Sequence, residues 1–95
     1  MKFRHILFNR VKSDAGFIVK IRHIEGFAEY REGDRIAVVT VDPVVGQPLS
    51  IVHKDEEVKW NPPHDAEVIP EEKRKQILQN VVDAMRFRRF RVEMV

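Results

Sequence analysis

The sequence predicts an α+β fold, in which an antiparallel sheet of about five or six strands carries one helix on one face and a last strand follows that helix. Three observations lead to this fold class. Up to residue 60, short runs rich in β-branched and aromatic residues are separated by turn signals. After residue 70, apolar residues recur at helical spacing, and near the C-terminus they alternate again. Because the chain has only 95 residues and no linker, we expect a single domain over residues 1–95.

The N-terminal part of the chain predicts strands joined by tight turns. Residues 2–8 have apolar side chains in both phases, which indicates a strand partly buried on both faces. Residues 13–16 (Ser-Asp-Ala-Gly) predict a turn, and residues 17–22 nearly alternate between apolar and polar side chains. A third strand is predicted over residues 27–31, and the Glu-Gly-Asp sequence at 32–34 predicts a tight hairpin.

The middle of the chain contains the most apolar predicted strand. Residues 35–41 form a nearly continuous apolar run, which is typical of a strand at the centre of a sheet. The Asp-Pro pair that follows ends it, because proline cannot donate to a strand ladder. A short strand is predicted over residues 49–53 and a further one over 55–60. Residues 61–65 (Asn-Pro-Pro-His-Asp) are predicted to be extended, since a residue before proline avoids the helical region.

One helix is predicted from residue 70 onwards. Pro70 suits the first helical position, and Glu71 and Glu72 complement the positive end of the helix dipole. The apolar stripe expected to face the sheet consists of Ile77, Leu78, Val81, Val82 and Met85. After the helix, residues 90–94 alternate between apolar and charged side chains, which predicts the last strand.

The net charge of +2 conceals a segregation of charge along the chain. Residues 1–24 carry six bases against one acid, residues 25–72 carry twelve acids against four bases, and residues 73–95 carry seven bases against two acids. An acidic middle flanked by basic ends is typical of a protein that meets charged partners. The alternative is that the strands and the helix have solvated faces of opposite sign.

The sequence lacks the motifs of the common enzyme classes. It has no glycine-rich phosphate loop, no nucleophile elbow, no His-Glu-x-x-His pair and no cysteine. We therefore expect no enzymatic activity, no cofactor and no metal. An alternative metal site would use His53, Asp55, His64 and Asp65, but their spacing does not select for metal binding. No apolar run reaches the length of a membrane span, and the first residues are too charged for a signal peptide, so we expect a cytoplasmic protein.

Acidic residues are concentrated between residues 55 and 72, where seven of them fall within eighteen positions. Such a group can steer a basic partner and cover its anion-binding surface. The predicted partner-binding residues are Asp55, Glu56, Glu57, Asp65 and Glu67. Trp60 and a Pro-Pro pair lie among these acids, a composition typical of an interface. The alternative for Trp60 is a buried position in the core.

Arginine is concentrated near the C-terminus. Basic residues interleaved with Phe87 and Phe90 would contact phosphates while the rings stack on bases. The residues of this alternative nucleic-acid site are Arg86, Arg88, Arg89 and Arg91. The competing interpretation places both phenylalanines in the core and the arginines at the helix C-terminus, where positive charge is favourable. The acidic middle of the chain disfavours a nucleic acid as the partner.

Three motifs suggest a family. They are Tyr-Arg-Glu-Gly-Asp-Arg at 30–35, Trp-Asn-Pro-Pro-His-Asp at 60–65, and the glutamate-rich helix start at 70–78. Together they resemble small bacterial immunity proteins of polymorphic-toxin and contact-dependent growth-inhibition systems. The resemblance covers about residues 27–95 and implies an α+β cytoplasmic protein that binds and neutralises a cognate toxin, often a nuclease. Residues 1–24 lie outside it, and the positive net charge departs from the acidic balance common among nuclease inhibitors.

Overall fold

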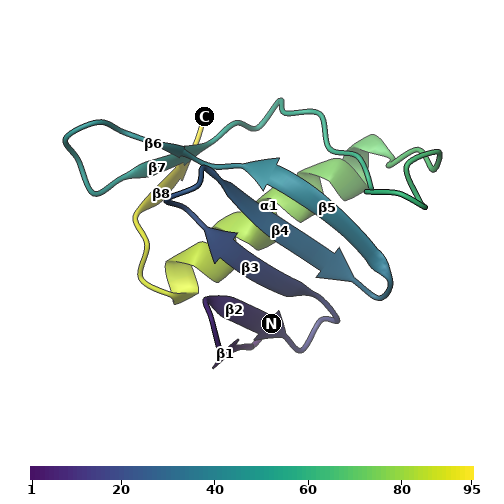
Figure 1. Ribbon diagram of the computed structural model, residues 1–95, viewed down its shortest axis with the longest axis horizontal. Helices are drawn as coiled ribbons and strands as arrows, with labels where there is room; N and C mark the ends of the chain where they lie inside the picture. The colour runs from purple at the N-terminus through teal and green to yellow at the C-terminus, as the bar shows by residue number, and fades with distance from the viewer.

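The computed structural model describes residues 1–95, which form two sheets and one helix (Figure 1). The larger sheet has five strands: β1 (Phe3–Ile6), β2 (Arg10–Ser13), β3 (Ile18–Arg22), β4 (Phe27–Glu32) and β5 (Arg35–Thr40). The smaller sheet has three strands: β6 (Asp42–Pro43), β7 (Ser50–Val52) and β8 (Val92–Met94). The helix, α1, spans Glu71–Phe87. The predicted α+β fold class is confirmed.

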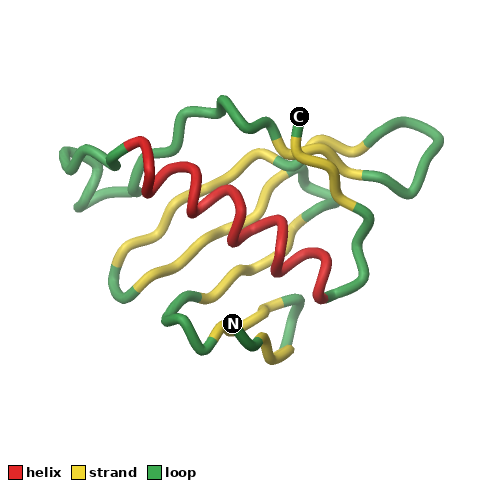
Figure 2. The backbone as a smooth tube through the Cα atoms, turned by 180° about the vertical axis from the view of Figure 1, so that it is seen from behind, coloured by secondary structure: helices red, strands yellow, loops and turns green.

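The five-stranded sheet is an antiparallel meander, in which each strand pairs with the next one along the chain. Helix α1 crosses one face of this sheet, and the opposite face has no helix on it (Figure 1 and Figure 2). The smaller sheet lies at one end of the molecule, where β7 pairs antiparallel with β6 and parallel with β8. The predicted last strand is therefore confirmed, and it joins the smaller sheet rather than the main one.

The core lies between the five-stranded sheet and α1. The strand register aligns Val11, Val19, Tyr30 and Ala37 across β2 to β5, and all four are buried. The helix buries every residue of its predicted stripe, namely Ile77, Leu78, Val81, Val82 and Met85. The helical period of these residues therefore predicted correctly which face of α1 packs on the sheet. No helix in the structure is both long and apolar enough to cross a membrane.

Strand β5 lies at the edge of the sheet, so its predicted central position is wrong. A loop, rather than a further strand, covers its free edge. Trp60 forms an isolated bridge with Ala37, and the Asn61 N–H donates to the Ile36 carbonyl at 2.6 Å. The strand predicted over residues 55–60 is reduced to this bridge. Only one face of β5 packs on the core, since Ala37 and Val39 are buried while Val38 is 42% exposed, so its apolar run does not reflect burial on both faces.

Strand β2 has no counterpart in the prediction, although β1, β3, β4 and β7 match predicted strands within a few residues. Val11 and Ser13 of β2 are buried, whereas Arg10 and Lys12 are exposed. The strand thus alternates as a half-buried strand should, but only one of its core positions is apolar. A pattern based on hydrophobicity alone does not detect such a strand.

A polar network joins β4 to α1. The Tyr30 hydroxyl donates to the Glu32 carboxylate at 2.6 Å and accepts from the Asn80 amide at 3.2 Å. The Lys73 ammonium donates to both oxygens of Glu32 at 2.7 Å. Burial raises the pKa of the Tyr30 phenol further above its ordinary value. Desolvation alone would raise the pKa of Glu32, but the hydrogen bonds from Lys73 and Tyr30 outweigh it and hold that pKa below its ordinary value.

The free energy of unfolding is expected to fall as the pH drops below 4.5, the ordinary pKa of glutamate. Because the pKa of Glu32 is lower in the folded chain than in the unfolded one, its stabilisation is complete above that pH and is lost as the pH falls through the folded value. Urea unfolding at about pH 7 and about pH 3 measures the loss. Glu32→Gln should reduce the difference between the two pH values, and Glu57→Gln, at an exposed position, should leave it unchanged. Equal pH dependence in both variants would contradict this prediction.

Candidate functional site

The predicted partner-binding acids lie in two groups at opposite ends of β5. Glu56 contacts Thr40 at the C-terminal end of the strand, and Glu67 contacts Arg35 at the N-terminal end. The extended strand separates these two ends by about 17 Å. The first group is Asp55, Glu56 and Glu57, and the second is Asp65 and Glu67. The acids that are close in the sequence therefore flank β5 instead of forming one cluster.

Glu67 is engaged in an ion pair. Its carboxylate accepts two hydrogen bonds from the Arg35 guanidinium, at 3.0 and 2.8 Å. One of its oxygens also lies 2.9 Å from Nδ1 of His64. The hydrogen bonds from Arg35, opposed by desolvation and reinforced by His64, lower the pKa of Glu67. This bidentate pair attaches the loop before α1 to the hairpin between β4 and β5.

Glu56 stabilises the edge of β5. Both of its carboxylate oxygens accept from the Thr40 N–H, at 2.9 and 3.2 Å. The Arg74 guanidinium donates to the backbone carbonyls of Lys54 and Glu56, at 2.7 and 3.0 Å. Arg74 also donates to both carboxylate oxygens of Glu71, and these hydrogen bonds lower the pKa of Glu71. Arg74 therefore ties the first acidic group to the first turn of α1.

The other three acids have surface carboxylates. Asp55 and Asp65 are exposed, and neither forms an ion pair within the chain. Glu57 is 77% exposed and pairs only with Lys59, at 3.3 Å. A surface pair of this kind contributes little to stability, so a partner can replace it at low cost. Unlike Glu56 and Glu67, these three carboxylates make no hydrogen bond to β5.

Trp60 lies in the core, which confirms the core interpretation and not the interface one. Its side chain is 6% exposed, and its ring stacks on Tyr30 with centroids 6.4 Å apart. The backbone of Trp60 covers the edge of β5 through the bridge to Ala37, while the ring belongs to the core. The acids around Trp60 in the sequence therefore do not surround an exposed aromatic anchor.

The arginines near the C-terminus point to several different places. Phe87 packs on a ring of β1 at 5.6 Å, and Phe90 packs on the His23 ring at 4.5 Å. Arg86 donates to a backbone carbonyl of β8 at 2.9 Å, and Arg88 contacts the turn between β1 and β2 at 3.4 Å. The two residues of this group that remain exposed without such contacts are Arg89 and Arg91. The structure does not gather a continuous row of bases and free aromatic rings here.

The histidines of the alternative metal site have separate partners. Nε2 of His53 lies 2.6 Å from the Asp42 carboxylate. His64 contacts Glu67 at 2.9 Å and Asp34 at 3.4 Å. No group of three histidine, cysteine, aspartate or glutamate side chains is arranged to hold a metal ion.

We expect the purified protein to contain no stoichiometric metal, because its two candidate histidines pair with carboxylates in different places. Elemental analysis of protein purified without chelators measures this directly. About one equivalent of zinc, iron or manganese that is lost in His53→Ala or His64→Ala would contradict the expectation.

A basic surface on the five-stranded sheet was not among the predicted sites. On β1 to β5, the residues that alternate with the core residues point away from α1, and we call this surface the open face. Its charged residues are the bases Arg4, Arg10, Lys12, Lys20, Arg22 and Arg31 and the single acid Glu29. Ile6, Ile18 and Ile36 lie among them and are half-buried. The excess of bases in residues 1–24 was the available signal, but only the strand register shows that they share one face.

Comparison with known protein families gives one match, to the model described as Immunity protein 74, over residues 25–95. Comparisons with curated proteins and with solved structures find no significant match. The matched range covers about three quarters of the chain and includes β4, β5, the smaller sheet and α1, while β1, β2 and β3 precede it. The resemblance to small immunity proteins is thereby confirmed, and the chain belongs to the Immunity protein 74 family.

Proposed function

We propose that this protein is a toxin inhibitor that binds a cognate bacterial toxin domain in the cytoplasm and covers its active or substrate-binding surface. The observation that carries this proposal is the family match over residues 25–95. Inhibition by binding requires a complementary surface and no catalytic residue. A nuclease from a polymorphic-toxin or contact-dependent growth-inhibition system is the partner class that the sequence resemblance implies.

We propose further that the acids beside β5 attract the toxin. The exposed acids that make no hydrogen bond to β5 are Asp55, Glu57 and Asp65. A nuclease needs a basic surface to hold phosphates, and acids at the rim of the inhibitor's interface accelerate association with such a surface. Glu56 and Glu67 add negative charge in the same regions while their oxygens remain bonded within the chain.

Co-expression with the toxin domain encoded beside this chain tests the function. The expected results are restored growth of the host and a 1:1 complex in calorimetry. The toxin's own activity should be lost when the purified protein is added in slight excess. A toxin that remains fully active with excess protein present would show that the proposal is wrong.

Reversing two surface acids is expected to slow association with the toxin about tenfold at low salt. Asp55→Lys with Glu57→Lys is the suitable variant, because it leaves the Glu56 carboxylate on the edge of β5. Asp14→Lys with Asp83→Lys makes the same change of net charge between β2 and β3 and on the second half of α1, away from β5, and is the control. Stopped-flow association at about 20 mM and about 300 mM salt should show a difference that shrinks as salt screens it. Equal association rates for both variants would contradict the role of these acids.

The nucleic-acid alternative predicts the reverse pattern. Arg89→Glu with Arg91→Glu would then abolish binding to a mixed RNA pool, whereas Asp55→Lys with Glu57→Lys would leave RNA binding unchanged. If RNA is the only ligand bound, and only the arginine variant loses it, the inhibitor proposal has to be abandoned.

A further inference from the structure

We propose that the open face is a docking surface for an acidic protein surface that carries apolar side chains among its carboxylates. The partner is the toxin domain, so the inference rests on the proposed function. The acids beside β5 would then accelerate the encounter, while the open face would supply the close contact. The surface is built mainly from residues 4–24, which precede the range matched by the family model.

The first observation is charge. Strand pairing on the open face places positively charged side chains directly opposite each other. Arg4 lies directly opposite Lys12 in the register of β1 and β2, and Arg10 lies opposite Lys20 in that of β2 and β3. Like charges directly opposite each other on a sheet are destabilising. Lys20 has one distant counterion, Glu29 at 4.0 Å, and the other three bases form no ion pair. Carboxylates of a partner laid on this face would relieve the repulsion.

Apolar surface is the second observation. A hollow of about 150 Å³ lies on the open face, with Ile6, Ile18 and Ile36 among its lining and Arg10 and Arg31 beside them. Isoleucine side chains half-exposed between arginines provide an apolar contact with a charged rim, which is the composition expected of an interface.

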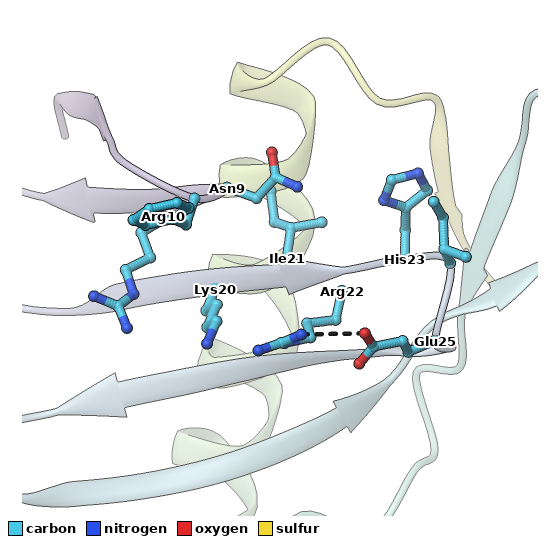
Figure 3. Close-up of a pocket in the computed structure, with 9 residues that line it drawn as sticks. Asn9, Arg10, Lys20, Ile21, Arg22, His23 and Glu25 are labelled. Carbon is cyan, nitrogen blue, oxygen red and sulfur yellow. Dashed lines mark hydrogen bonds and ion pairs between the residues drawn. The ribbon is translucent and has the colours of Figure 1, made fainter.

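A second hollow adjoins the first. It has a volume of about 400 Å³ and lies between the turn that joins β1 to β2 and the turn that joins β3 to β4. Arg10 and Lys20 line both hollows, so the two form one continuous surface. Lys20 and Arg22 lie on one side of β3 and Ile21 lies on the other, toward the core (Figure 3). Arg22 and Glu25, which both line the second hollow, pair at 3.1 Å.

The two turns present large apolar side chains to solvent. Leu7 is 74% exposed, Phe8 is 81% exposed and Ile24 is 87% exposed. Phe8 also has a φ of 61°, a left-handed conformation that is unfavourable for a bulky side chain. The turn is held in place by the Ile21 N–H, which donates to the Asn9 carbonyl at 2.9 Å. Exposed and strained apolar residues beside a hollow indicate contact with another molecule.

A protein fits this surface better than a nucleic acid. Most of its apolar side chains are aliphatic, and these pack against apolar side chains but do not provide the aromatic platforms on which bases stack. Glu25 and Glu29 line the two hollows and would repel phosphates. A protein surface can place carboxylates opposite the arginines and apolar groups opposite the isoleucines.

Calorimetry with the toxin domain encoded beside this chain tests the surface. Arg10→Glu with Arg31→Glu should weaken binding at least about 100-fold, because it sets acid against acid in the contact. Phe8→Asn should weaken binding about tenfold while the melting temperature stays the same or rises, since asparagine tolerates a left-handed conformation. Arg89→Glu with Arg91→Glu gives the same change of net charge at exposed positions elsewhere, and should stay within about threefold of the wild type.

The outcomes separate this inference from the proposed function. If the wild type binds and neutralises the toxin and the open-face variants do so equally well, the inference is wrong and the function stands. If the wild type binds no toxin domain, the proposed function fails. The open face is then tested separately, by following amide NMR shifts during titration with a heptapeptide of alternating glutamate and leucine. Shifts confined to the strands β1 to β5 and the turns between them, and absent with a lysine–leucine twin, support the inference. The inference is overturned if no shifts appear or if both peptides give equal shifts. It is also overturned if the face binds RNA and Arg10→Glu with Arg31→Glu abolishes that binding, or if the protein forms a homodimer that Phe8→Asn dissociates.

Discussion

Replacing Trp60 by alanine is expected to lower the free energy of unfolding by about 3–5 kcal/mol. The ring is 6% exposed and stacks on Tyr30, so the substitution leaves a cavity in the core. It also removes the side chain that anchors in the core the segment whose backbone bridges to Ala37 on the edge of β5. A domain of this size has a total stability of only about 5–10 kcal/mol, and the variant should therefore be largely unfolded at 37 °C. Urea unfolding followed by circular dichroism measures the change.

Trp60→Phe is the matched control, since it keeps an aromatic ring at the same place and should cost less than the alanine variant. The alanine variant should also aggregate more readily, because an uncovered strand edge can pair with a second chain. An unchanged melting temperature combined with lost binding of the toxin would show instead that the ring is a contact residue.

The helix was predictable because its information is local. The positions from Ile77 to Met85 repeat at helical spacing, and each apolar position there is buried as the pattern requires. The strands with alternating apolar residues were predictable for the same reason. Strand β2 was not, since a serine occupies one of its two core positions. The position of β5 was also mistaken, because its apolar run includes Val38, which is 42% exposed, and an apolar run therefore does not distinguish a central strand from an edge strand.

The candidate site depends on contacts that sequence spacing does not encode. Glu56 bonds to a residue 16 positions away and Glu67 to one 32 positions away, so their internal roles appear only in the folded chain. The sequence identified the acidic segment correctly as a charged region but could not separate its structural acids from its free ones. The open face was visible in the sequence only as an excess of positive charge. Only the strand register, which places Arg4 opposite Lys12, shows that these bases share one face of the sheet.

Replacing Tyr30 by phenylalanine is expected to lower the free energy of unfolding by about 1–3 kcal/mol, although it removes a single oxygen atom. The hydroxyl accepts from the Asn80 amide at 3.2 Å and donates to Glu32 at 2.6 Å. Asn80 is 5% exposed, so its amide group would be left buried beside an apolar ring. A buried donor without an acceptor loses its hydrogen bonds to water and gains nothing in return.

A double-mutant cycle with Asn80→Leu separates this cause from lost packing. Once Asn80 is apolar, the Tyr30 hydroxyl no longer has an amide to satisfy, and Tyr30→Phe should cost about 1 kcal/mol less than in the wild-type background. Tyr30→Phe should also raise the pKa of Glu32, because the carboxylate loses a donor, and the loss of stability on acidification should then be smaller and be complete at a higher pH. Both effects are measured in the same urea titrations. If Tyr30→Phe costs the same in both backgrounds, Tyr30 and Asn80 are not energetically coupled, and packing of the ring against Phe17 and Trp60 accounts for the position of Tyr30 instead.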